Sequence, residues 1–97
     1  MSRPRHYWYV IVKKMIEEYP YRERKLQAKL YEEAIEEALE ETKKLPNGEL
    51  RLKVINGVLF NKSLTCGGAA QSVGYEIHTI QKWISSFIHI VGRKVGY

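Results

Sequence analysis

The stretch CGGAAQSVGYEIHTIQKWIS, residues 66–85, decides the fold, because packing restricts the residue type at several of its positions. Small residues, Ala69 and Ala70, stand fourth and fifth, where two closely crossing helices leave no room for larger side chains. Gly74 stands ninth, where the chain turns and a positive φ is expected, which glycine adopts without steric cost. Apolar residues surround the turn at the eighth, tenth, fifteenth and eighteenth places: Val73, Tyr75, Ile80 and Trp83. This spacing predicts two helices joined by a tight turn.

Thr65 directly precedes the stretch and is expected to cap the first helix, since its hydroxyl can accept a backbone N–H of the next turn. The whole pattern is that of the helix-turn-helix, whose second helix enters the major groove of DNA. The same residue types can also join two packed helices that contact no nucleic acid. DNA binding is favoured because so many restricted positions agree in one register.

Length and composition predict one folded domain, residues 1–97. The chain is 44% hydrophobic and 28% charged, which suits a single modest core. A formal net charge of +5 favours an anionic partner, and nucleic acid is a common one. The charge is uneven, because residues 1–14 carry +4, residues 15–44 carry −3 and residues 45–97 carry +4. Phosphate contacts are therefore expected from the C-terminal half and the N-terminal arm.

The single cysteine, Cys66, excludes an intrachain disulfide and fits a reducing compartment. No apolar run approaches the roughly 20 residues that span a bilayer. Lys13 and Lys14 interrupt the apolar residues near the start, unlike a secretory signal. We therefore expect a cytoplasmic protein with no membrane partner.

Apolar residues recur at spacings of three and four rather than two, which predicts an all-α fold: a small helical domain of about five helices. Residues 1–6 are expected to form a loose arm, and residues 7–44 two N-terminal helices divided at Pro20. Residues 45–48, LPNG, are of types that are typical of turns and are expected to end the second helix. Residues 49–97 are expected to form the helix-turn-helix unit.

Each N-terminal helix has one expected buried face. In the first, it consists of Trp8, Ile11, Val12, Met15, Ile16 and Tyr19. In the second, expected over residues 22–44, it consists of Leu26, Leu30, Tyr31, Ala34, Ile35, Ala38, Leu39 and Thr42. Paired glutamates at 32–33, 36–37 and 40–41 occupy the other side, which is expected to be solvated. The alternative is a basic partner such as a polymerase subunit.

In the C-terminal unit, helices are expected from about Glu49, over 67–73 and over 77–95. The first of these is apolar nearly all round, which predicts that it is the central helix of this C-terminal unit. The last has more apolar surface than the unit needs: Trp83, Ile84, Phe87, Ile88, Ile90 and Val91. We expect the helix that begins at Tyr7 to cover this surface, and a second subunit, as in a homodimer, is the alternative.

The outward residues early in the second helix of the pair are the expected base contacts: Glu76, Ile77, His78, Gln81 and Lys82. Gln81 suits adenine, Lys82 suits guanine, and Glu76 can accept from the amino group of cytosine. Ile77 suits a thymine methyl group if it lies outside the core. A solvated face is the alternative for all five.

Expected phosphate contacts lie near the start of the first helix of the pair, on the helix before it, and near the chain end: Arg51, Lys53, Lys62, Ser63, Thr65, Arg93 and Lys94. Arg3 and Arg5 could enter a minor groove, with a disordered basic tail as the alternative. No enzyme activity, metal or cofactor is expected, because His6, His78 and His89 lack partners at ligand or catalytic spacing.

Residues 5–20 and 50–96 carry a resemblance to a known family. The second segment, LRLKVINGVLFNKSLTCGGAAQSVGYEIHTIQKWISSFIHIVGRKVG, resembles the C-terminal part of the small phage and prophage transcription regulators of the RinA and ArpU kind, which is similar to region 4 of a sigma factor. This resemblance implies a regulator that binds promoter DNA in a bacterial host cell and contacts host RNA polymerase.

Two other classes of function remain open at this level. One is a phage DNA-packaging factor that resembles small terminase subunits, which also combine a helix-turn-helix with long helices but form rings. The other is a helical module that uses its apolar C-terminal helix and acidic second helix to hold another protein.

Overall fold

The computed structural model describes residues 7–20 and 29–97, and no strand occurs among them. The described residues form five α-helices: α1 (Tyr7–Glu18), α2 (Lys29–Lys43), α3 (Gly48–Ile55), α4 (Cys66–Val73) and α5 (Ile77–Lys94). α3 continues directly into a π-helical segment, Asn56–Phe60. The prediction of an all-α domain of about five helices, with a helix-turn-helix at its C-terminal end, is confirmed.

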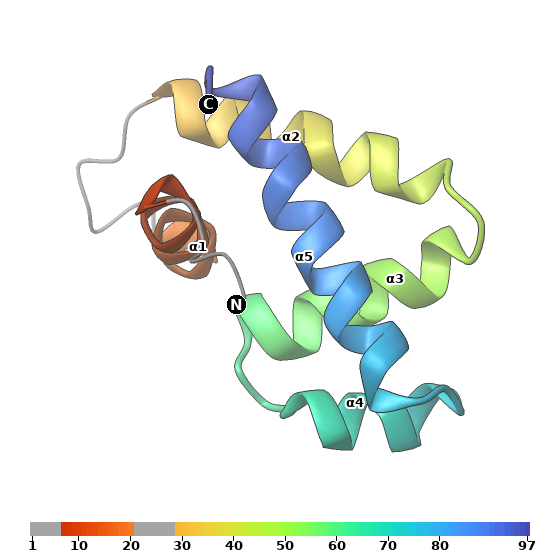
Figure 1. Cartoon of the computed structure of the whole chain (residues 1–97). Helices are drawn as coiled ribbons and strands as arrows, with labels where there is room; N and C mark the ends of the chain where they lie inside the picture. Colours follow the sequence, from red (N-terminus) through yellow and green to blue (C-terminus); the bar gives the residue numbers. More distant parts are fainter. Residues whose placement is uncertain (1–6, 21–28) are drawn as a thin grey trace, which may run out of the picture.

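The central helix is α5, which contacts each of the other four helices. In Figure 1, α5 crosses the middle of the molecule, with α1 on one side, α2 and α3 on the other, and α4 at its N-terminal end. The helix starting near Glu49 was expected to be the central helix of the C-terminal unit, but this prediction was wrong, because α5 contacts both α3 and α4 and takes that place. α3 and its π-helical continuation together span residues 48–60, whereas α5 has 18 residues and presents a longer apolar side to its neighbours.

The apolar surface of α5 is covered within the chain, as the sequence predicted. All six of its surplus apolar residues are buried: Trp83, Ile84, Phe87, Ile88, Ile90 and Val91. α1 and α2 both lie against the helix. The Trp8 ring packs so closely on Gly92 that a Cβ atom at that glycine would lie 2.6 Å from the ring. The helix that begins at Tyr7 thus occupies the place for which a second subunit was the alternative.

Most helix ends fall within one residue of their predicted positions. α4 begins at Cys66 rather than Gly67, and α5 ends at Lys94 rather than Val95. The arm over residues 1–6 lies outside the described residues, and so does the part of the predicted second helix before Lys29. None of the described helices combines the length and the apolar character needed to cross a membrane.

Two residues that were assigned to buried faces are exposed. The exposed fraction is 45% for Ile11 and 53% for Leu30. The neighbouring positions Val12 and Ile16 on α1, and Ala34 and Ile35 on α2, are buried. α5 covers a narrow stripe on each of these helices, so residues at the edge of the apolar face remain in contact with solvent. Leu26 lies outside the described residues.

Candidate nucleic-acid interface

The turn between α4 and α5 has the geometry that the sequence predicted. Thr65 caps α4, because its side-chain oxygen accepts a hydrogen bond from the Gly68 N–H at 3.0 Å. Gly74 ends the helix with φ at 79°, in the left-handed region that favours glycine. Its N–H donates to the Ala70 carbonyl at 2.9 Å, and the Tyr75 N–H donates to the same carbonyl at 3.1 Å. The direction of the chain therefore changes sharply, and α5 starts two residues later.

Small residues allow α4 and α5 to pack together. Ala69 and Ala70 are both buried, and α4 contacts α5. From α5, Ile80 and Trp83 are buried at the positions that the motif reserves for apolar groups. The pair is therefore fixed as a unit, with one side of α5 facing the core.

The other side of the first two turns of α5 faces solvent. The five residues predicted to contact bases are all exposed: Glu76, Ile77, His78, Gln81 and Lys82. Ile77 is 47% exposed, so it lies outside the core, as a contact with a thymine methyl group requires. Residues four apart lie above one another on a helix, so these side chains form one continuous surface. We call this surface, residues 76–78, 81 and 82, the exposed face of α5.

Glu76 occupies the N-cap position of α5 without making a side-chain cap. Its backbone is extended, with φ at −71° and ψ at 148°, and its carboxylate accepts no capping hydrogen bond. Those oxygens are therefore free to accept from an amino group of a base. Lys82 stands on the same exposed face, so that face contains a charge of each sign and little net charge.

The loop before α4 presents polar residues to solvent. Lys62, Ser63 and Thr65 are all exposed, as predicted for phosphate contacts. Thr65 uses its oxygen as an acceptor in the cap, so its hydroxyl proton remains a donor. Lys62 has a φ of 54° and its ammonium lies 3.4 Å from a carboxylate oxygen of Glu17, which connects the loop to α1. Lys53 is exposed on α3.

Arg51, another predicted phosphate contact, is held by contacts within the chain. Its Nε donates to the Pro46 carbonyl at 2.9 Å. Its guanidinium carbon lies 5.4 Å from the centre of the Trp83 ring, within the range of a cation–π contact. The residue is half-buried, and its contact with Trp83 connects α3 to the second turn of α5.

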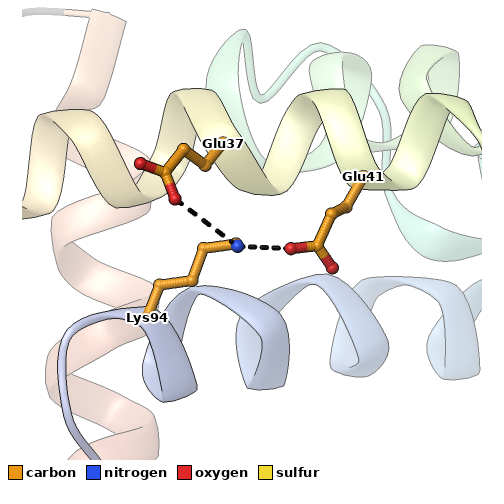
Figure 2. Close-up of polar contacts among 3 residues, drawn as sticks. All are labelled: Glu37, Glu41 and Lys94. Carbon is orange, nitrogen blue, oxygen red and sulfur yellow. Dashed lines mark ion pairs between the residues drawn. The ribbon is translucent and has the colours of Figure 1, made fainter.

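Arg93 and Lys94 lie at the opposite end of α5 from the turn. The helical rise of about 1.5 Å per residue places Arg93 roughly 24 Å from Ile77. The Lys94 ammonium makes ion pairs with Glu41 and, at 3.5 Å, with Glu37 of α2 (Figure 2). The hydrogen bond from Lys94 lowers the pKa of the Glu41 carboxyl, and the same bond raises the pKa of Lys94. We therefore leave both residues out of the interface around the turn.

The acidic side of α2 is separated from this interface. α2 lies beside the C-terminal half of α5, and α4 lies at the N-terminal end (Figure 1). Five of the six paired glutamates are exposed, as expected of a solvated side, and Glu32 is half-buried. Glu37 and Glu41 also pair with Lys94, and Glu36 accepts a hydrogen bond from the Tyr19 hydroxyl at 3.1 Å. The negative charge of α2 thus lies away from the exposed face of α5.

Tyr75 was assigned to the apolar set of the motif, but 38% of it is exposed. One part of its ring packs on Trp83, with the ring centres 5.1 Å apart. The residue directly precedes the exposed face of α5. Its position next to the turn glycine was the only sequence signal that could have placed it at the surface. Arg3 and Arg5 lie outside the described residues.

Within residues 7–20 and 29–97, no group of three or more His, Cys, Asp or Glu side chains is arranged to hold a metal ion. Cys66 is a free, half-buried thiol at the start of α4. Comparisons of the chain with protein-family models, with curated proteins and with solved structures found no match.

Proposed function

We propose that this protein is a sequence-specific DNA-binding protein that reads the major groove with the first two turns of α5. One observation carries the proposal. The five side chains predicted to read bases are all exposed on one face, while the other side of the same helix is buried against α3 and α4. A helix that enters the major groove needs one solvent-exposed face that can contact bases and an opposite face that is packed against the rest of the domain.

Three further features support this function. The turn at Gly74 has the left-handed backbone of the motif, and Thr65 caps the helix that would cross the DNA backbone. Lys53, Lys62 and Ser63 supply exposed cations and a hydroxyl for phosphates. The acidic residues of α2 lie away from this surface, so they do not repel the duplex at close range.

The resemblance of residues 50–96 to phage and prophage regulators suggests the biological setting. In that setting the protein acts in the cytoplasm of a bacterial host, binds promoter DNA and contacts RNA polymerase. The function as a helical interaction module is less favoured, since the apolar surface of α5 that it would use is buried inside the chain.

The test is a titration of labelled duplex at several salt concentrations. For each phosphate that a lysine neutralises, the slope of log K against log salt gains about 0.9 in magnitude. Lys62→Ala is expected to weaken binding equally for all sequences and to reduce this slope. Gln81→Ala with Lys82→Ala is expected to lower the preference for a selected site over random duplex, because base contacts contribute about 1–3 kcal/mol each.

Lys43→Ala is the matched control, because it removes the same charge from an exposed position on α2. It should leave both the site preference and the slope close to those of the wild type. The proposal fails if the wild type binds duplex without any dependence on salt or sequence. It also fails if the Gln81 and Lys82 double variant keeps the full preference for the selected site.

A further inference from the structure

Tyr75 is placed to take part in the interface, and this inference rests on the proposed function. The residue lies between the turn glycine and Glu76, the N-cap of α5. When the start of a helix enters the major groove, the residues just before it lie at the groove edge, where the phosphates are. An exposed side chain at this position is therefore next to the DNA backbone.

The ring of Tyr75 is held in place before any ligand arrives. Its centre lies 5.1 Å from that of Trp83, at an angle of 59° between the planes. Trp83 is buried, and it also contacts the guanidinium of Arg51, which is fixed by its bond to the Pro46 carbonyl. The backbone of Tyr75 is fixed as well, by its bond to Ala70. A side chain that is already ordered loses little conformational entropy on binding.

The hydroxyl of Tyr75 has no hydrogen-bond partner within the part of the chain that the structure describes. A phenolic O–H is both a donor and an acceptor, and tyrosine is one of the side chains that bond DNA phosphates. Stacking on a base is the less suitable contact, because part of the ring already packs on Trp83 and duplex bases are stacked on one another.

We propose that Tyr75 is a DNA-contact residue, and that its hydroxyl donates a hydrogen bond to a backbone phosphate at the edge of the major groove. Tyrosine is uncharged, so it neutralises no phosphate and releases no counterion from the DNA. It contributes affinity that does not depend on base sequence, and the stack of Tyr75, Trp83 and Arg51 holds the hydroxyl in position.

Tyr75→Phe tests this contact, since it removes the hydroxyl and keeps the ring on Trp83. A hydrogen bond from the uncharged hydroxyl to an ionised phosphate corresponds to a loss of affinity of about ten- to a hundredfold. We expect that loss for a selected site and for random duplex alike, with an unchanged slope of log K against log salt and an unchanged melting temperature. Lys62→Ala, measured beside it, should reduce the slope by about 0.9.

Tyr31→Phe is the matched control, because it removes the same atom from a tyrosine of α2 whose hydroxyl bonds Tyr97. Its affinity for duplex should equal that of the wild type. The inference is overturned if Tyr75→Phe binds as tightly as the wild type, or if its salt slope changes as that of a lysine variant does. A wild type that binds no duplex would overturn the proposed function and this inference together, whereas wild-type binding with a silent Tyr75→Phe overturns this inference alone.

Discussion

Gly74→Ala should destabilise the protein through the backbone alone. Nothing lies within 4 Å of a Cβ atom added at this position, so the new methyl group meets no neighbour. The destabilisation therefore comes only from the backbone, whose φ is 79°. A left-handed backbone costs a residue other than glycine about 1–2 kcal/mol of folding free energy. Alanine also lowers the conformational entropy of the unfolded chain, which stabilises the folded state by about 0.4–1 kcal/mol. The net loss is about 1 kcal/mol, or about 4–8 °C in melting temperature for a domain of this size.

Gly67→Ala is the matched control, because the same chemical change is not expected to lower the melting temperature at this position. Gly67 lies in α4, its φ is not positive, and an added Cβ would make an ordinary contact with Ile77 at 3.9 Å. Because alanine favours helix over glycine by up to about 1 kcal/mol, this variant should melt at or above the wild-type temperature. Thermal unfolding followed by circular dichroism measures both. Equal shifts for the two variants, or a Gly74→Ala variant as stable as the wild type, would refute the turn geometry.

Gly92→Ala should destabilise the protein and lower its melting temperature, because its Cβ would lie 2.6 Å from the Trp8 ring. Overpacking costs about 1–3 kcal/mol, and the gain in helix propensity offsets up to about 1 kcal/mol of that loss. In a Trp8→Ala background the same change should become neutral or stabilising, and a double-mutant cycle that returns no coupling would contradict the contact. Thr42→Val should stabilise the protein by about 1 kcal/mol, since the buried Thr42 hydroxyl finds no hydrogen-bond partner among the described residues; a lower melting temperature would argue against this. When the pH falls, Lys94→Met should lose less unfolding free energy than the wild type does. The lowered pKa of Glu41 makes its pair with Lys94 stabilising above the usual value of 4.5, and that contribution disappears as the pH falls through the folded-state pKa. A variant with the same pH dependence as the wild type would rule out this linkage.

The helices, the turn and the exposed face of α5 could be predicted because each depends on local sequence. Gly74 fixes a backbone conformation, and the apolar spacing of α5 fixes which side is buried. A one-residue change of register would have rotated a different set of residues outward. Exposure of Ile77 was left open by the sequence, because an apolar residue at the edge of a face can lie on either side of the boundary.

The remaining features depend on contacts between distant parts of the chain, which periodicity does not encode. Lys94 was assigned to DNA because it is basic and near the chain end, yet two glutamates of α2 bind it. Arg51 is similar, since its partner Trp83 belongs to another helix. The requirement for glycine at position 92 could not be predicted from the sequence, because it arises from the close packing of Trp8 of α1 against that position.

The central claim is that the exposed face of α5 reads base edges, and selection of duplexes from a random pool tests it most directly. The wild type should enrich one shared sequence motif. Gln81→Ala with Lys82→Ala should lose preference at particular positions of that motif while it still binds duplex. A wild type that enriches no motif, or a double variant that enriches the same motif as strongly, would contradict the account.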